Sequence, residues 1–321
     1  MRRSTSLRLG VVASLVALAM LAGEAASSVS AAPAGHAAYD QARCPDGSHA
    51  LARVKAGGKG QEPALYPKNQ ANAYGVLEDR PTLPSGSVRV PTVFHMVSDH
   101  ENTPAEQARW EGLIAAQMDV LNDAFSGDTA LDAADTPFRF DLTGITWSVN
   151  ADWYTVVPGK AGHERDMKRS LYSGDARTLH VYAANIGGNL LGWAYFPKGY
   201  NHGRDFIDGI VILDESMPGG NAGQYALGDT LVHEVGHWLM LEHTFAHGCS
   251  ASGDWVTDTP PEAVPQFECT VGADTCAAPG LDPIRNFMDY TPDDCMDMFT
   301  PGQADRMSDA WLQFRAGGGK S

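Results

Sequence analysis

Three histidines and two glutamates lie close together in one largely apolar stretch, Leu231-Val-His-Glu-Val-Gly-His-Trp-Leu-Met-Leu-Glu-His243. His233 and His237 are four residues apart, so on a helix their imidazoles lie about 40° apart on one face, one turn from each other. Two neighbouring zinc ligands need this geometry, and Glu234 can reach a water bound to the same metal. The stretch predicts a zinc site on a helix with Glu234 as the catalytic base; two ordinary histidines are the alternative interpretation.

His243 is the candidate third ligand, although a straight helix would not bring it to the same ion. It lies six residues beyond His237, so the chain has to turn sharply between them. In the motif H-E-x-x-H-x-x-G-x-x-H a glycine makes that turn, whereas this chain has Met240 there. A residue with a Cβ costs roughly 1–2 kcal/mol in a left-handed conformation, which three metal bonds can offset. Glu242 and His247 are weaker candidates for the third ligand.

A second motif, Asn286-Phe-Met-Asp-Tyr290, follows further along the chain. A methionine in a tight turn beneath the metal, followed two residues later by a tyrosine, is typical of the Met-turn of metzincin proteases. Alone, Met288 would be interpreted as an ordinary core methionine. Together with the zinc stretch, it predicts a metzincin zinc site.

Further segments share this pattern: His233 to Phe245, Gly248-Cys249, Gly253-Asp254 with Asp258-Thr-Pro260, Asn286 to Tyr290, Cys295-Met296 with Phe299-Thr-Pro-Gly-Gln303, Leu191-Gly-Trp-Ala-Tyr-Phe-Pro197 and Asp208-Gly-Ile-Val211. With them the chain resembles the pappalysin family of metzincins, and its secreted microbial branch in particular. The similarity covers roughly Val88 to Phe314, and Met240 in place of glycine is its main deviation.

The resemblance implies an α+β fold, in which an upper subdomain with a twisted mixed sheet and helices stands above an irregular, disulfide-linked lower one. An extended substrate would lie in the cleft between them. It also implies that Tyr290 hydrogen-bonds the oxyanion of the reaction, a role known only by geometry. Structural calcium is implied near Asp254 and Thr259, where carboxylate and carbonyl oxygens suit a hard cation; a plain solvated turn is the alternative.

Five cysteines are present: Cys44, Cys249, Cys269, Cys276 and Cys295. In an oxidising compartment the last four suggest two disulfides with three possible connectivities, and the absence of a CxxC pair disfavours a zinc ribbon. The resemblance implies the pairs Cys249–Cys276 and Cys269–Cys295. Cys44 is left over, and we hypothesise that its thiolate holds the zinc's open position in a latent zymogen. A free or intermolecular cysteine is the alternative.

Residues 1–32 have the pattern of a signal peptide. Three arginines precede the apolar stretch Leu9 to Leu21, and small residues follow it. The apolar stretch is shorter than the ~20 residues that a membrane span needs. We therefore predict a secreted, extracellular protein without a stable membrane anchor.

The remaining chain divides into three predicted parts. Residues 33–85 are rich in Gly, Pro and Ala and are predicted to be a pro-segment or linker. Residues 86–316 form the metzincin catalytic domain, and 317–321 a flexible tail. Within the domain, strands are expected near 88–96, 138–147, 178–182 and 209–213, and capping boxes at Thr103–Glu106 and Thr300–Gln303 open two helices.

Composition limits the possible partners. The formal net charge is -16, which argues against nucleic-acid binding because a phosphate backbone favours a basic face. Hydrophobic residues make up 43% of the chain, enough for a sizeable core. The expected partners are protein or peptide substrates, and the expected cofactors are one catalytic zinc and structural calcium.

The predicted function is zinc-dependent endopeptidase activity. Asp293 and Asp294 follow the Met-turn, where metzincin substrate pockets close, and one of them, with Asp294 favoured, is expected to select Arg or Lys just after the scissile bond. Two exposed loop acids are the alternative.

Two rival functions remain. In a different zinc hydrolase class, an acid such as Glu262 would be the third ligand. In a catalytically impaired zinc-binding protein, Met240 would have disabled the site, but the intact Glu234 argues against this.

Overall fold

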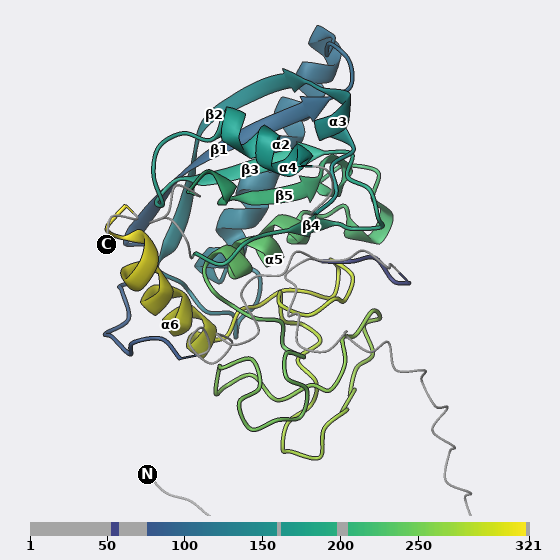
Figure 1. The fold of residues 1–321 in the computed structure, drawn as a ribbon. Helices are drawn as coiled ribbons and strands as arrows, with labels where there is room; N and C mark the ends of the chain where they lie inside the picture. Colours follow the sequence, from purple (N-terminus) through teal and green to yellow (C-terminus); the bar gives the residue numbers. More distant parts are fainter. Residues whose placement is uncertain (1–52, 58–75, 159–161, 198–204, 319–321) are drawn as a thin grey trace, which may run out of the picture. The chain divides into compact units, whose positions relative to one another are not determined.

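The computed structural model describes residues 53–57, 76–158, 162–197 and 205–318. The predicted signal peptide, Cys44 and the last three residues lie outside the described residues. The helices and strands, shown in Figure 1, are β1 Val88–Ser98, α2 Pro104–Ser126, β2 Phe138–Val149, α3 Ala151–Tyr154, α4 His163–Leu171, β3 Leu179–Ala184, β4 Gly192–Trp193, β5 Ile210–Leu213, α5 Asp229–Trp238 and α6 Pro301–Ala310. The four expected strands and both expected helices are confirmed.

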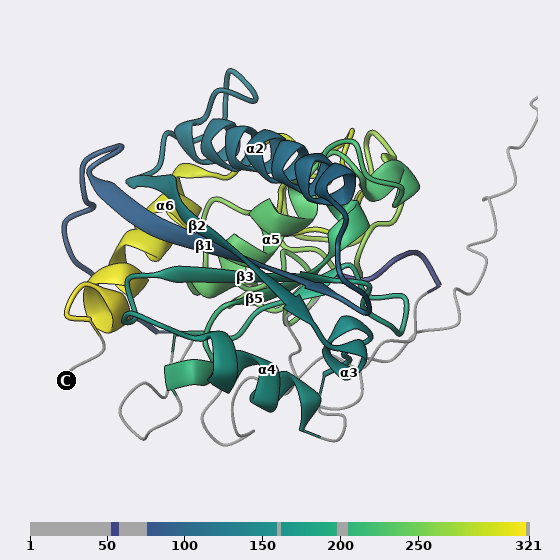
Figure 2. The same ribbon diagram turned by 90° about the horizontal axis from the view of Figure 1, so that it is seen from above.

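A five-stranded sheet has the order β2-β1-β3-β5-β4. The pairs β1–β2, β1–β3 and β3–β5 are parallel, and β4 is antiparallel to β5, so the sheet is mixed as expected. Parallel neighbours need long crossover connections, which α2 and α4 provide. Figure 2 shows α2 and α5 on one face of the sheet and α3 and α4 on the other.

Both predicted capping boxes are formed. The Thr103 side chain accepts from the backbone of Glu106 at the start of α2, and Thr300 and Gln303 make the same exchange at the start of α6. Each box satisfies backbone N–H groups that a helix start otherwise leaves without a partner. Because these signals are local in sequence, they place both helix starts correctly.

Helix α5 lies in the centre of the domain, where all of its residues are buried. Leu231, Val232 and Val235 belong to the main hydrophobic cluster, together with residues of β1, β3 and α2. Packing on all sides holds the helix in one orientation. The histidines of the zinc stretch are therefore carried on a rigid support.

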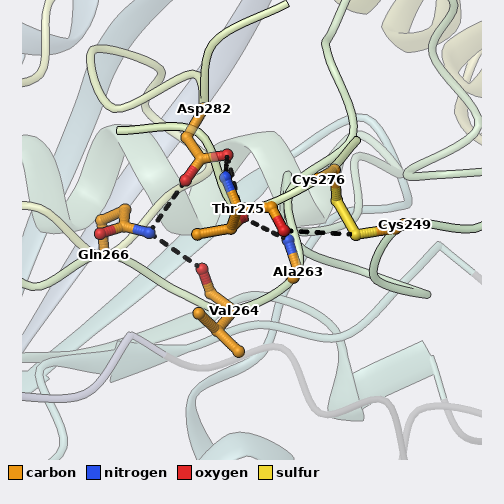
Figure 3. Close-up of a disulfide and its surroundings, with 7 residues drawn as sticks. All are labelled: Cys249, Ala263, Val264, Gln266, Thr275, Cys276 and Asp282. Carbon is orange, nitrogen blue, oxygen red and sulfur yellow. Dashed lines mark hydrogen bonds between the residues drawn. A yellow bond between two sulfur atoms is a disulfide. The ribbon is translucent and has the colours of Figure 1, made fainter. Parts of the chain in front are cut away.

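Residues between α5 and α6, all of them described, form no helix or strand beyond one isolated bridge. The disulfides Cys249–Cys276 and Cys269–Cys295 cross-link this region, and they are the pairs that the resemblance implies. Asp282 accepts from the backbone and side chain of Thr275 beside the first disulfide, as Figure 3 shows. The expected irregular, disulfide-linked lower part is thus confirmed.

Part of the predicted pro-segment or linker packs against the domain. Arg80 donates its backbone N–H to Asp309 Oδ1 at 3.1 Å, and Leu83 donates to Ser308 Oγ at 2.9 Å, so this segment is fixed to α6. The boundary at residue 85 remains a prediction. Among the described residues, no helix is both long enough and apolar enough to cross a membrane.

Candidate active site

Three imidazoles converge on one point. Nε2 of His237 lies 3.0 Å from Nε2 of His233 and 3.1 Å from Nε2 of His243. All three side chains are buried, and their ligand atoms form a group that could hold a metal ion. Nitrogens bound tetrahedrally to zinc at about 2.0–2.1 Å are separated by roughly 3.3 Å. The three histidines therefore fit a single zinc ion.

Hydrogen bonds on the opposite ring nitrogens orient two of these ligands. Nδ1 of His233 donates to the carbonyl of Phe287 at 2.6 Å, and Nδ1 of His237 donates to the carbonyl of Leu241 at 2.7 Å. Each bond leaves the Nε2 lone pair directed at the shared point. Burial lowers the pKa of His237 to about 3 and the pKa of His233 well below its usual value. Both rings are thus neutral, as metal ligation requires.

The sharp turn after α5 occurs at Met240, which has φ = 77°. Its N–H donates to the carbonyl of His237 at 2.8 Å, and the N–H of Leu241 donates to the carbonyl of Gly236 at 2.9 Å. These bonds end α5 at a residue in the left-handed conformation, a position that glycine usually occupies. Despite its Cβ, Met240 supports the turn that brings His243 to the other ligands.

The Met240 side chain compensates for this backbone conformation by packing. It is fully buried in a small cluster with Phe196 and Ala310, and its carbonyl accepts from Nε of Arg306 at 3.0 Å. Burying a side chain of this size contributes several kcal/mol relative to a truncated one. The packing therefore outweighs the strain of roughly 1–2 kcal/mol that the left-handed conformation costs.

Restoring the motif glycine with Met240→Gly is expected to destabilise the protein. The change removes the strain but loses a buried side chain worth about 2–5 kcal/mol, so the free energy of unfolding should fall by about 1–3 kcal/mol. Urea unfolding of the zinc-loaded protein measures this change. Greater stability of the glycine variant would show that strain, and not packing, dominates at this position.

The Met-turn lies directly beneath α5. Met288 is fully buried, and a Cβ built on Gly236 would lie 2.4 Å from its sulfur. Only glycine at position 236 allows this contact. Asn286 accepts from the N–H of Met288 at 3.0 Å and exchanges two amide hydrogen bonds with Gln303 of α6. The sequence analysis missed Gly236, whose signal was a glycine inside a helical pattern.

Glu234 is fully buried beside strand β4. A Cβ built on Gly192 would lie 3.0 Å from its Cγ and 3.1 Å from its Oε1. Gly192 thus leaves the room that the glutamate needs, which is a second glycine the sequence analysis missed. Gly192 of β4 and Glu234 of α5 thus define this side of the site.

Tyr290 lies against the third ligand. Its ring centroid is 4.8 Å from that of His243 and 5.8 Å from that of His233, and the residue is buried. Phe245 stacks on His243 at 4.7 Å, and its ring also lies 4.9 Å from that of Tyr290. The structure therefore brings Tyr290 to the metal site, while its catalytic role remains a prediction.

An arginine of the predicted pro-segment lies in this site. The backbone N–H of Arg53 donates to Oε1 of Glu234 at 3.0 Å, across 181 residues of sequence. Its side chain is fully buried and pairs with Asp293 at 2.7 Å. Figure 1 shows this short purple segment between β4 and the irregular C-terminal loops. Nothing in the composition of residues 33–85 indicated the contact.

The two candidate pocket acids face different ways. Asp293 is buried and accepts from the N–H groups of Leu227 at 2.9 Å and Gly228 at 3.2 Å, whereas Asp294 is exposed. The backbone N–H of Asp293 donates to the carbonyl of Gln224 at 3.1 Å. Asp293 is thus the acid that lies buried against Arg53, while the expectation that one of the two acids, with Asp294 favoured, selects the substrate stays a prediction.

The two residues expected at a calcium site lie together. Thr259 donates to Oδ1 of Asp254 at 2.6 Å, and both residues are buried. Oδ2 of Asp254 has no hydrogen-bond partner among the described residues. Burial raises the pKa of Asp254 to about 7. A buried carboxylate oxygen of this kind fits a cation, so the calcium prediction stands, untested.

The rival third ligands are bound elsewhere. Oε2 of Glu262 accepts from Thr244 at 2.7 Å, and Glu262 is absent from the metal-binding group of histidines found among the described residues. Glu242 and His247 pair with each other at 3.1 Å. The hydrolase class with an acid as third ligand is therefore wrong for this chain.

A twisted mixed sheet above a zinc helix, three convergent histidines, an adjacent buried glutamate and a Met-turn define a metallopeptidase of the metzincin class. The family model described as Peptidase M43, pregnancy-associated plasma protein-A, matches residues 192–311. The chain belongs to this family, the pappalysins, since it is also 42% identical over 236 residues to Extracellular metalloprotease 1 of Coccidioides posadasii, covering 72% of this chain and 79% of that one.

Three further matches agree. An extracellular metalloprotease of Verticillium alfalfae is 40% identical over 235 residues, covering 72% of this chain and 80% of the relative. The structure of mature mirolysin of Tannerella forsythia in complex with a cleaved peptide is 26% identical, with a TM-score of 0.58, covering 74% of this chain and 100% of that chain. A promirolysin mutant of the same organism is 28% identical with a TM-score of 0.59, covering 76% and 85% of the two chains.

Proposed function

We propose that this protein is a secreted zinc endopeptidase that hydrolyses the peptide bond just before an arginine or lysine. The observation that carries the preference is Arg53, whose N–H lies on Glu234 while its side chain fills the pocket of Asp293. The signal-peptide pattern and the relatives named extracellular metalloproteases support secretion. The peptide complex of mirolysin supports a peptide substrate.

His233, His237 and His243 would hold the zinc. When bound, zinc lowers the pKa of a water toward ~7 and polarises a carbonyl. Glu234 takes a proton from the attacking water and returns it to the leaving nitrogen. The 3.0 Å distance from Glu234 to a backbone nitrogen supports the second transfer. Tyr290 would donate a hydrogen bond to the oxyanion, and its position beside His243 supports this role.

The pocket proposed around Asp293 carries the negative charge that would bind a basic side chain. Burial, and then the charge of Asp293, raise the pKa of Asp229, while Arg53 opposes this shift. The carboxyl groups of Asp229 and Asp293 therefore lie close together, and the guanidinium of Arg53 offsets part of their repulsion. A buried carboxylate and an arginine form a strong, charge-assisted hydrogen bond, because the guanidinium can donate two parallel N–H groups. This supports selection of a basic side chain just after the scissile bond.

The variant Asp293→Asn tests the preference. Asparagine keeps an oxygen for the two backbone N–H donors but removes the charge, and breaking a buried ion pair costs about 3–5 kcal/mol. We expect kcat/KM for peptides with arginine after the scissile bond to fall by about 100-fold or more, and cleavage before uncharged residues to change little. Cleavage profiling on a peptide library, read by mass spectrometry, measures both.

The exposed neighbour provides the matched control, because Asp294→Asn should leave the arginine preference intact. A wild-type enzyme indifferent to basic residues would refute the proposed specificity, and equal losses in both variants would refute the role of Asp293. Complete inactivity of the zinc-loaded wild type on every peptide would favour the alternative, a catalytically impaired zinc-binding protein. The complete three-histidine site with Glu234 beside it argues against that alternative.

We further propose calcium at Asp254 and Thr259. Saturating calcium at about 100 times its Kd would add roughly 2.7 kcal/mol of stability, which raises the Tm of a domain of this size by about 5–10 °C. Differential scanning calorimetry with and without calcium measures the shift, and Asp254→Asn should abolish it. An unchanged Tm of the wild type would remove calcium from the proposal.

A further inference from the structure

Strand β4 lies between Glu234 and a second buried glutamate, Glu164. Consecutive side chains of a strand point to opposite faces of a sheet. At Gly192 the strand faces α5, where Cγ of Glu234 lies 3.0 Å from the position that a Cβ would take. At Trp193 it faces α4, where the indole N–H donates to Oε1 of Glu164 at 2.8 Å. One short strand therefore contacts both glutamates, from opposite faces.

The backbone pairing of β4 is short. The strand has two residues and stands last in the sheet order, and within the described sheet it pairs with β5 alone, Gly192 with Ile212 and Trp193 with Val211. Strands in globular proteins are usually about 3–10 residues long. Since so few backbone bonds fix β4, its position depends on side-chain contacts.

Glu164 supplies these contacts. Besides the indole of Trp193, it accepts from the hydroxyl of Tyr195 at 3.0 Å, and it forms an ion pair with Lys168 at 3.1 Å. The side chain of Lys168 is fully buried and that of Glu164 is 6% exposed. Both carboxylate oxygens thus hold β4 and the residues that follow it to α4, which lies on the sheet face opposite α5 in Figure 2.

Lys168 ties the same ion pair to strand β5. Its Nζ donates to the carbonyls of Ile207 at 3.0 Å and Gly209 at 3.2 Å, just before β5 begins, and it lies 4.6 Å from the centre of the Tyr195 ring. Helix α4 therefore holds β4 through the glutamate and the start of β5 through the lysine.

Stability alone does not explain a buried ion pair of this kind. Taking two charges out of water is costly, and a well-packed apolar pair of similar volume is often as stable or more stable. A fully bonded polar cluster instead favours a single arrangement, because each hydrogen bond has a preferred direction. The arrangement that this cluster fixes is the position of β4.

We propose that Glu164 is a positioning residue, which holds β4 at the distance from Glu234 that peptide hydrolysis needs. The inference rests on the proposed function, since Glu234 is the general base of that reaction. Gly192 lies so close to Glu234 that a movement of β4 toward α5 would push the carboxylate aside. A movement away would let the carboxylate turn from the attacking water, and a misplacement of about 1 Å can lower a rate roughly 100-fold.

The double variant Glu164→Leu/Lys168→Met tests this role, because it replaces the whole ion pair with apolar side chains of similar volume. We expect kcat for peptide cleavage to fall by about 100-fold, while the urea midpoint stays at or above that of the wild type and the zinc content is unchanged. A lower midpoint with a wild-type kcat in the folded enzyme would show a role in stability alone and would overturn the proposal.

Glu164→Gln is the matched control. Its amide oxygen can accept from the indole of Trp193 and its amide N–H can donate to the hydroxyl of Tyr195, so both hydrogen bonds to the β4 segment are kept. Burial already lowers the pKa of Lys168, and a neutral amine keeps two N–H groups for its two carbonyl partners. We expect kcat within about fivefold of the wild type. A loss as large as in the double variant would show that the charge, and not the hydrogen bonds to β4, supports activity, and would overturn the proposal.

Trp193→Phe tests the same contact from the strand, with the ion pair intact. Phenylalanine keeps an aromatic ring in the buried cluster but has no N–H to donate to Glu164. This variant should lower kcat by about tenfold, and the same change in the double variant should add little, because the contact is already lost there. It also decides the question if the double variant does not fold. A wild-type kcat in folded Trp193→Phe would overturn the proposal.

The wild type distinguishes a failure of this proposal from a failure of the proposed function. A folded, zinc-loaded wild type that cleaves no peptide would refute the proposed function. A wild type that cleaves peptides, together with a double variant of equal kcat, would refute the positioning role of Glu164 and leave the proposed function standing.

Discussion

Glu234→Gln is expected to lower kcat/KM for peptide cleavage by about 100- to 10,000-fold without loss of zinc. Glutamine has the same shape and keeps one oxygen, so it fits the room that Gly192 leaves. It cannot accept a proton from water, which removes the general base and, later, the acid that protonates the leaving nitrogen. The loss should fall on kcat, because the substitution leaves the pocket proposed around Asp293 unchanged.

Peptide-cleavage kinetics and zinc content, measured on the same preparations, test this result. The matched control is Glu242→Gln in the same stretch, because Glu242 is also buried but pairs with His247 and does not belong to the metal-binding group of histidines. That variant should stay within about tenfold of the wild type. Activity of Glu234→Gln within tenfold of the wild type, at full zinc content, would exclude Glu234 as the base.

His243→Ala is expected to release the zinc and abolish activity. Changes to groups that merely orient a ligand already cost 10- to 100-fold in metal affinity, so removing one of three ligands should cost about 100-fold or more. Its Nε2 lies 3.1 Å from that of His237, and no other described residue joins the group. Neither Glu242 nor Glu262 can replace it, since both are bonded elsewhere.

Competition against a chromophoric chelator measures the zinc affinity of this variant. His247→Ala is the matched control: the residue lies four positions further on, is partly exposed and pairs with Glu242, so zinc should be retained. Unchanged zinc affinity in His243→Ala would contradict the three-histidine site and, with it, the mechanism proposed for this protein.

The sequence predicts those features whose causes are local. A capping box needs residues three apart, and both boxes were found. Two zinc ligands four residues apart need only a helix, and α5 supplies it. The turn at Met240 runs against the local preference for glycine, yet the spacing to His243 required it. The spacing of the three histidines was therefore a better guide to the turn than the identity of residue 240.

Features that depend on distant segments were not predictable. The contact between Arg53 and Glu234 spans 181 residues, and no periodicity or composition signals it. Asp293 and Asp294 are neighbours of the same type, so only the surrounding fold decides which of them is buried. The close approach at Gly236 likewise follows from the Met-turn packing beneath α5.

In the proposed function, the edge of the sheet beside β4 also limits which proteins the enzyme would digest. There the carbonyl of Asn189 and the N–H of Leu191 bond Lys55 and Arg53 of an extended segment, and a substrate bound in the same way would have to be extended too. In a helix the backbone N–H and C=O groups are already hydrogen-bonded to each other. In the middle of a native sheet they are hydrogen-bonded to the strands on both sides. Intact globular proteins should thus resist attack except where thermal opening frees a short stretch, and their lifetime should follow the free energy of that opening.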